Sequence, residues 1–299
     1  MAHGTGTNGD LAALLGEYSV EVTSRDTPAV EAAASMMRAG TEVFVANLPK
    51  ESADMLVGAA RTLKRAGLSP VPHIVARNIA GPRDLEEMLA RLAGEAGVER
   101  ALVLGGDRDV PAGPFDAALQ LVETGAFQRA GIGRIAIGCY PEGHARIPDD
   151  ILARALRDKL AAAAENGLDV LLVSQFVFDP RPVVAFAESL RREGIATPLR
   201  VGVAGPADRA RLIKYALRCG VGASLRILRE RSELARNVLA GETPDEILGA
   251  IAAAAAERPA LAISGVHFFT FGNPAGSISW AEEARAAAAP PPLRAAAGR

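Results

Sequence analysis

The sequence predicts a (β/α)₈ TIM barrel, an α/β fold in which eight parallel strands close into a cylinder. Apolar runs of strand length alternate with amphipathic helical patterns, and eight such strand patterns occur along the chain. Several of them break into polar or glycine residues at their carboxyl ends. Alternation of this kind favours a parallel sheet. The count of eight favours closure of that sheet into a barrel.

The strand patterns are short runs in which Val, Ile, Leu and Ala predominate, as expected where both faces of a sheet are buried. They lie at 18–23, 41–46, 69–76, 100–105, 134–139, 168–174, 199–203 and 261–267. Helical patterns lie between them, among others at 50–65, 83–94, 149–166, 181–194 and 207–218. In 83–94, residues Leu85, Met88, Leu89 and Leu92 recur at the spacing of one helix face. Residues 221–258 predict extra helices between the seventh and eighth strands.

Residues 1–287 are expected to form a single barrel domain, because α/β barrels of about 250 residues are commonly one domain. The first ten residues are expected to be loose. Residues 288–299 are rich in Ala and Pro and low in complexity, which predicts a disordered tail.

Composition and charge argue against several classes of partner. The chain carries 33 basic and 35 acidic residues without a long basic run, so no nucleic-acid partner is expected. No apolar run approaches the roughly 20 residues of a membrane span. The two cysteines lack metal-ligand spacing, so no metal site is expected and a reducing cytoplasm is the natural location. Barrels of this kind often associate through their outer helices, so a homo-oligomer is expected.

Polar residues follow three successive strand patterns. Asp107 comes after LVLGG, the run Tyr140, Glu142 and His144 follows the fifth strand, and Gln175 interrupts LLVSQFVF. The carboxyl ends of barrel strands meet at one face, where binding groups gather. The sequence therefore predicts one shared site at this face.

Each candidate also has a structural interpretation. Glu21, inside the first strand, is either a paired structural glutamate or a general acid whose pKa is raised by burial. Asp107 could simply belong to a turn, and His73 could be a core histidine with satisfied hydrogen bonds. Gln175 must bond to protein or to a ligand, because an unpaired buried amide costs about 1–3 kcal/mol. The aromatic cluster around His267 favours core packing.

Six short motifs in chain order resemble the methylenetetrahydrofolate reductase family. They are Glu21, PHIV (72–75), LGGD (104–107), YPEGH (140–144), SQFVFD (174–179) and HFFTFGN (267–273). The resemblance covers about residues 17–285. It implies a (β/α)₈ barrel that holds FAD at the carboxyl ends of its strands. It also implies the reduction of 5,10-methylenetetrahydrofolate to 5-methyltetrahydrofolate, with NAD(P)H as hydride donor.

The resemblance also assigns roles to individual residues. Glu21 matches the acid that protonates folate N10, and Asp107 matches the aspartate that stabilises the iminium cation. Gln175 and Phe176 match positions at the folate substrate. The residues that match contacts to FAD are His73, Gly106, Asp107, Tyr140, His144 and Lys159.

Departures from the family pattern mark the chain as a divergent member. Gly105 stands where the family commonly has arginine, and Ala46 stands where it has threonine. Three alternatives therefore remain open. The chain could run the reverse oxidation in methyl-group catabolism. It could be a flavin-free folate-binding protein that acts with a methyltransferase partner. It could also pass hydride directly from NADH to folate without flavin.

Overall fold

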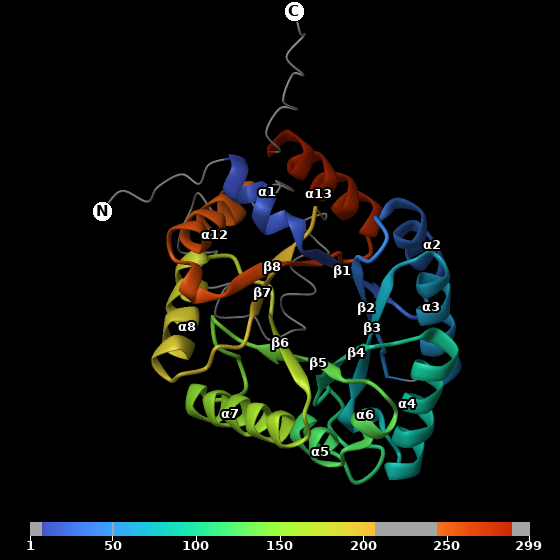
Figure 1. Ribbon diagram of the computed structural model, residues 1–299. Coiled ribbons are helices and arrows are strands. Elements are labelled where there is room, and N and C mark those ends of the chain that lie inside the picture. The colour runs from blue at the N-terminus through green and yellow to red at the C-terminus, as the bar shows by residue number, and fades with distance from the viewer. Residues whose placement is uncertain (1–7, 50, 207–243, 289–299) are drawn as a thin grey trace, which may run out of the picture.

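The computed structural model, which describes residues 8–49, 51–206 and 244–288, is the predicted barrel (Figure 1). Eight parallel strands pair in chain order, and β8 closes on β1. The strands are β1 (Tyr18–Thr23), β2 (Glu42–Ala46), β3 (Ser69–Val75), β4 (Arg100–Leu104), β5 (Arg134–Cys139), β6 (Asp169–Ser174), β7 (Leu199–Ala204) and β8 (Ile263–Phe269). Each lies within one or two residues of its predicted bounds.

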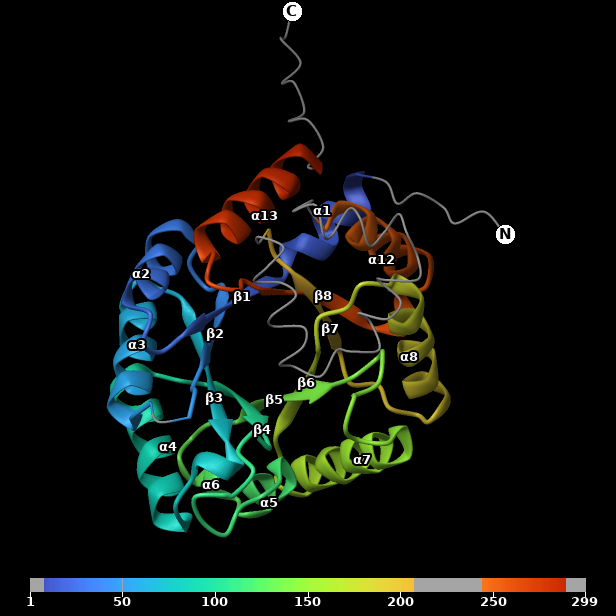
Figure 2. The ribbon, with the colours of Figure 1, turned by 180° about the vertical axis from the view of Figure 1, so that it is seen from behind.

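Helices form a ring outside the strands in both views (Figures 1 and 2). They are α1 (Asn8–Gly16), α2 (Thr27–Met36), α3 (Ala53–Arg65), α4 (Pro82–Ala96), α5 (Ala118–Glu123), α6 (Ala126–Arg129), α7 (Asp149–Glu165), α8 (Pro180–Arg192), α12 (Asp245–Glu257) and α13 (Pro274–Ala288), with 3₁₀ turns η1 (Ala76–Asn78) and η2 (Pro259–Leu261). Across the described ranges, no helix combines the length and apolarity needed to cross a membrane.

The predicted extra helices between the last two strands are confirmed in part. Helix α12 falls inside the predicted region 221–258, whereas the pattern at 207–218 and residues 221–243 lie outside the described residues.

One prediction about the chain ends is corrected. Residues 8–10 belong to α1, where looseness was expected, because Leu14 and Leu15 bury their side chains and the helix contacts α12, α13 and β8. Helix α13 ends at Ala288, the first residue of the predicted tail. Residues 289–299 lie outside the described residues.

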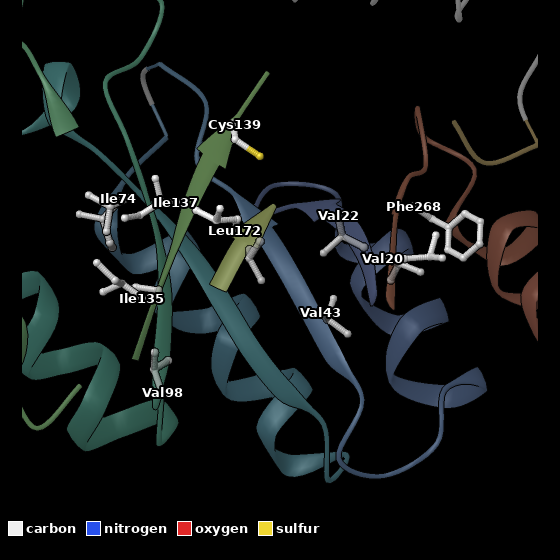
Figure 3. Close-up of a cluster of buried hydrophobic side chains, with 14 of the residues drawn as sticks. Val20, Val22, Val43, Ile74, Val98, Ile135, Ile137, Cys139, Leu172 and Phe268 are labelled. Atoms are coloured by element: carbon white, nitrogen blue, oxygen red, sulfur yellow. The ribbon is translucent and has the colours of Figure 1, made fainter. Parts of the chain in front are cut away.

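The strands are apolar because both of their faces are covered. Outward side chains such as Val20 of β1 and Ile137 of β5 pack in the layer between strands and helices (Figure 3). Inward side chains form a second, smaller core that fills the barrel. Its members are Phe44, Val71, Leu102, Ala136, Leu171 and Val173. The filled interior leaves the two barrel ends as the places for polar groups.

A buried charge cluster occupies the amino end of the barrel. Glu42 on β2 lies 2.9 Å from Arg100 Nε and also pairs with Arg200 of β7. All three side chains are largely buried. Burial raises the pKa of the Glu42 carboxyl, but Arg200 and Arg100 outweigh burial and hold it below its usual range. One carboxylate thus compensates two guanidiniums from strands far apart in the sequence.

We expect Glu42→Gln to lower the free energy of unfolding by about 3–5 kcal/mol, because it leaves both buried guanidiniums without their counter-charge. Glu99→Gln is the matched control. Glu99 pairs with Lys64 and Arg134 but is 64% exposed, so its loss should cost less than about 1 kcal/mol. Urea denaturation measures both. Equal, small losses would show that solvent already screens the Glu42 cluster.

Candidate functional site at the carboxyl ends of the strands

Glu21 lies at the centre of the site, flanked by two histidines from other strands. Its Oε2 atom is 3.6 Å from His73 Nε2 of β3 and 3.9 Å from His267 Nε2 of β8. Both imidazoles are buried, whereas a quarter of the Glu21 side chain remains exposed. The ring of Phe44 lies against both histidines, with ring centroids 6.2 Å from His73 and 4.5 Å from His267. The carboxyl group is therefore reachable from solvent but fixed between two rings.

The electrostatics of this group differ from the sequence hypothesis. Burial raises the pKa of Glu21, but His267 and His73 outweigh burial and place it below its usual value. The expectation of a raised pKa for Glu21 is therefore wrong. Burial lowers the pKa of His73 to about 4, against the opposing charge of Glu21. Burial also lowers the pKa of His267, again against Glu21. Near neutral pH the site holds a carboxylate between two neutral imidazoles.

A second group of predicted residues gathers on the loops after β4 and β5. The rings of Tyr140 and His144 meet edge to face with centroids 5.2 Å apart. Burial and Arg146 lower the pKa of His144, while the nearby Asp107 carboxylate opposes them. Gly106 shapes this loop, since its φ is +101° and a Cβ atom there would lie 2.4 Å from Val75 Cγ1. The structure thus brings Gly106, Asp107, Tyr140 and His144 to one side of the barrel mouth.

The remaining predicted residues have protein partners of their own. The Oε1 atom of Gln175 accepts a hydrogen bond from the Phe176 N–H at 3.0 Å. Phe176 is 1% exposed and packs edge to face against Phe178, Phe269 and Phe271, so it supports the wall of the mouth. Their roles at the substrate stay predictions.

Lys159 of α7 lies apart from the loop residues, near the outward-facing Cys139. Burial lowers the pKa of its ammonium, and the Cys139 thiol opposes that effect. Cys139 belongs to the layer between strands and helices. Lys159 is therefore placed between β5 and α7, and its role at a cofactor phosphate stays a prediction.

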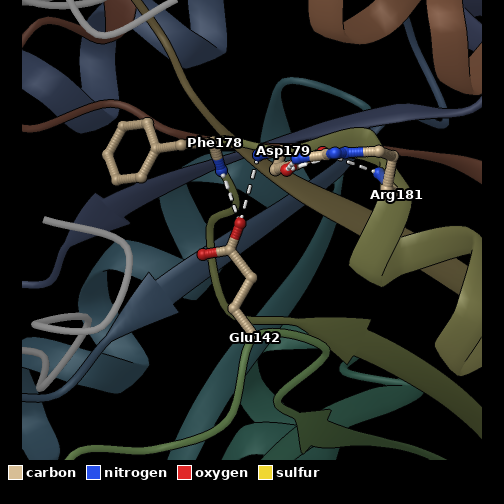
Figure 4. A network of polar contacts seen from close by, with 4 residues as sticks. All are labelled: Glu142, Phe178, Asp179 and Arg181. Atoms are coloured by element: carbon tan, nitrogen blue, oxygen red, sulfur yellow. Dashed lines mark hydrogen bonds and ion pairs between the residues drawn. The ribbon is translucent and has the colours of Figure 1, made fainter. Parts of the chain in front are cut away.

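Glu142, which the sequence predicts to lie at the barrel mouth, connects the loop after β5 to the loop after β6. Its Oε1 atom accepts hydrogen bonds from the N–H groups of Phe178 (3.0 Å) and Asp179 (3.1 Å), as Figure 4 shows. Asp179 caps α8 by accepting from the Arg181 N–H, and it also pairs with the Arg181 guanidinium. The carboxylate of Glu142 thereby ties the loop after β5 to the start of α8.

Sequence reasoning missed several polar residues at this face. Ser19 lies below Glu21 on β1, and its Oγ is 2.9 Å from His267 Nδ1. Asn47 after β2 and Asn78 in η1 each have a buried Oδ1 atom that no described residue meets with a hydrogen bond. Asn47 carried a signal, because it is the first polar residue after the apolar run VFVA. Ser19 carried none, since a serine within a strand is common.

Several buried polar atoms at these strand ends are left for water or a ligand to satisfy. His73 Nε2 is buried without a hydrogen-bond partner among the described residues, as are the two asparagine oxygens. Such atoms cost free energy unless water or a ligand bonds to them. Pterin, nicotinamide and isoalloxazine rings all carry N–H and C=O groups at their edges. Among the described residues, no three His, Cys, Asp or Glu side chains are grouped so as to hold a metal ion.

Comparisons with known proteins establish the fold. No family model matches the chain. An uncharacterized protein from Clostridium thermocellum, which binds two copies of 5-methyl-5,6,7,8-tetrahydrofolic acid, is similar with a TM-score of 0.61 and 10% identity. That match covers 92% of this chain and 98% of the other. Dihydropteroate synthase from Thermus thermophilus matches with a TM-score of 0.49 and 15% identity over 89% and 93% of the two chains. At these identities, the first match shows a shared barrel architecture.

We expect Glu142→Ala to lower the free energy of unfolding by about 1–3 kcal/mol, because two backbone N–H groups lose a charged acceptor. Glu142→Gln is the matched variant, since its amide oxygen can still accept from Phe178 and Asp179. Urea denaturation should place it between the wild type and the alanine variant. If both variants were as stable as the wild type, the hydrogen bonds that Glu142 accepts would not contribute to the free energy of unfolding.

The two buried histidines predict a loss of stability in acid. In the unfolded chain a histidine titrates near pH 6.5, whereas His73 titrates at about 4 in the folded protein. Between these values the unfolded chain binds more protons, so acid favours unfolding. The free energy of unfolding should fall as pH drops from about 6.5, by up to about 1.4 kcal/mol per pH unit for each histidine. Glu21, whose pKa is also lowered, adds a loss of the same sign at lower pH.

Urea denaturation at a series of pH values measures this slope. His73→Gln should flatten it, because the variant has one fewer buried group to protonate. Identical slopes for the two proteins would contradict the burial of a neutral His73 imidazole.

Proposed function

We propose that the chain is an oxidoreductase that interconverts 5,10-methylenetetrahydrofolate and 5-methyltetrahydrofolate with NAD(P)H as co-substrate and FAD as cofactor. The observation that carries the proposal is the fixed Glu21 carboxyl at the carboxyl face, reachable from solvent and held between His73 and His267. A pure binding site for a neutral ring has little use for such a group. The folate ligand of the similar Clostridium thermocellum barrel supports the choice of substrate.

The residues of the mouth suit this chemistry. Glu21 would exchange a proton with folate N10, which must gain one when the five-membered ring opens and lose one when it closes. The Asp107 carboxylate would favour the cationic iminium between those states by Coulomb attraction. Gln175 and the unsatisfied His73 Nε2 would bond to the edges of the bound rings. FAD, held by the loop residues with Tyr140 and His144, would supply hydride transfer.

One observation favours a flavin-free variant of this function. Arg77 follows β3 at the same face, but its guanidinium donates to the carbonyls of Arg108 (2.9 Å), Asp109 (3.3 Å) and Asp116 (3.0 Å). This arginine holds the loop of Asp107 and is engaged there, while Gly105 replaces the arginine of the family pattern. The alternatives are then direct hydride transfer from NADH to folate, or folate binding beside a methyltransferase. A cytoplasmic location and assembly as a homo-oligomer stay part of the proposal.

The visible spectrum of the purified protein, before and after NADH or NADPH, tests the cofactor. A flavin spectrum that bleaches with one nucleotide supports the flavoenzyme and identifies the donor. A colourless protein that turns over folate supports direct transfer. A colourless protein with no turnover leaves folate binding alone, and isothermal calorimetry with 5-methyltetrahydrofolate then measures it.

We expect Glu21→Gln to reduce folate turnover by about 10²–10⁴-fold, the usual contribution of a general acid or base. Oxidation of NAD(P)H by an artificial acceptor needs no proton at N10 and should remain close to wild type. Glu99→Gln, a change of the same chemistry on the exposed surface, is the control. Loss of both activities in Glu21→Gln would contradict the assigned role.

A further inference from the structure

We propose that the amino end of the barrel binds one small monovalent anion, such as chloride or a short carboxylate, between the buried guanidiniums of Arg100 and Arg200. The site lies at the end of the barrel opposite Glu21, and it does not depend on the proposed function. It is inferred from an unbalanced buried charge and from two N–H groups that lack acceptors among the described residues.

The charge cluster of Glu42, Arg100 and Arg200 lies inside the barrel. These residues belong to β2, β4 and β7, and no two of those strands are neighbours in the sheet. The ion pairs of Glu42 with both arginines therefore cross the barrel interior. Two residues further along β2 and β4, Phe44 and Leu102 belong to the apolar core that fills the barrel. The cluster thus forms the layer of the interior next to that core, at the amino end.

The buried charges of this layer do not balance. Glu42 contributes one negative charge, whereas Arg100 and Arg200 contribute two positive charges, because guanidinium groups stay protonated. Arg200 is only 6% exposed. Burial lowers the pKa of Arg100, Glu42 raises it, Arg134 and Arg200 lower it again, and the net direction is downward. A buried charge without full compensation is costly, so an anion at this point would stabilise the layer.

The neighbouring charged groups do not remove this excess. Arg134 of β5 is paired in register with Arg100 and adds a further positive charge. Its partner Glu99 is 64% exposed and also pairs with Lys64. Asp169 is paired in register with Arg134 across β5 and β6, but it is exposed, so water and salt screen its charge. These carboxylates balance the rim of the barrel end, whereas the buried guanidiniums keep their excess charge.

Two N–H groups of the buried guanidiniums need an acceptor. Arg200 donates to Glu42 through Nη1, and its buried Nε–H meets no acceptor among the described residues. Arg100 Nε lies 2.9 Å from Glu42 Oε1, but its N–H is not directed at that oxygen, and no other described residue accepts from it. Buried donors without partners cost free energy. One anion between the two side chains could accept from both.

The exposure and the charge of the cluster define the kind of ligand. The side chains of Glu42 and Arg100 remain 16% and 17% exposed, so a small ion can approach from the amino end. The excess is a single positive charge, which one monovalent anion balances. A divalent anion such as phosphate would leave a negative excess beside Glu42. Chloride and formate therefore fit the site better than phosphate does.

Binding can be measured on the purified protein by the line width of chloride in ³⁵Cl NMR. We expect broadening by the wild type, and added sodium formate should remove it by competing for the same site. Arg200→Met should abolish this broadening. Glu42→Gln should bind chloride about tenfold or more tightly, because it removes the negative charge that repels the anion. Arg157→Met is the matched control, since Arg157 is 51% exposed and has its own partner, Glu193.

Urea denaturation in a chloride series provides a second readout. The urea midpoint of the wild type and of Arg157→Met should rise with chloride until the site is filled, and that of Glu42→Gln should rise more steeply. The inference would be overturned by wild-type broadening that equals that of Arg200→Met or that formate leaves unchanged. Chloride binding by Glu42→Gln that is no tighter than in the wild type would also overturn it. If neither variant folds, the competition between chloride and formate in the wild type decides.

Discussion

Closure of the strands into a barrel forces every inward ionisable side chain to find a partner on another strand. The interior is a filled apolar core, and a lone charge inside it would be costly. Glu42 at the amino end pairs with Arg100 and Arg200, and Glu21 at the carboxyl end lies against two histidines. Phe44 belongs to the core between these two charged ends. The rest of the interior can be apolar because the charges are confined to its ends.

The two carboxylates have different kinds of partner, and this difference separates structure from chemistry. Guanidinium groups remain charged at any accessible pH, so the Glu42 cluster is a permanent ion network. Imidazoles buried to this degree are neutral near pH 7. Glu21 is therefore ionised beside two neutral rings, which make it a stronger base than two adjacent cations would. Both carboxylates are largely buried, with 16% of the Glu42 side chain and 25% of the Glu21 side chain exposed, so the kind of partner distinguishes them. The same residue type thus serves folding at one end and reactivity at the other.

Strand positions could be predicted because a strand covered on both faces is almost wholly apolar, which is visible in any short window of sequence. Helix α1 was missed because the elements that it contacts, α12, α13 and β8, all lie near the other end of the chain. The expectation that the pKa of Glu21 is raised was wrong for a similar reason, because the shift depends on residues far from Glu21 in the sequence. Burial could be inferred from the strand around it, but the opposing histidines come from the third and eighth strands.

Polar residues at strand ends also turned out to be of two kinds, and sequence alone could not separate them. Glu142 has backbone N–H partners and Arg77 has backbone carbonyls, so both hold loops in place. His73 Nε2 and Asn47 Oδ1 are buried and have no hydrogen-bond partner in the part of the chain that the structure describes. A folded chain rarely leaves such atoms unsatisfied unless water or a ligand completes them. Position at the mouth therefore identifies candidate residues for the proposed folate site, and an unmet hydrogen bond supports such a candidate only together with that position, because buried atoms of Arg200 and Gln128 elsewhere in the described residues also lack a partner.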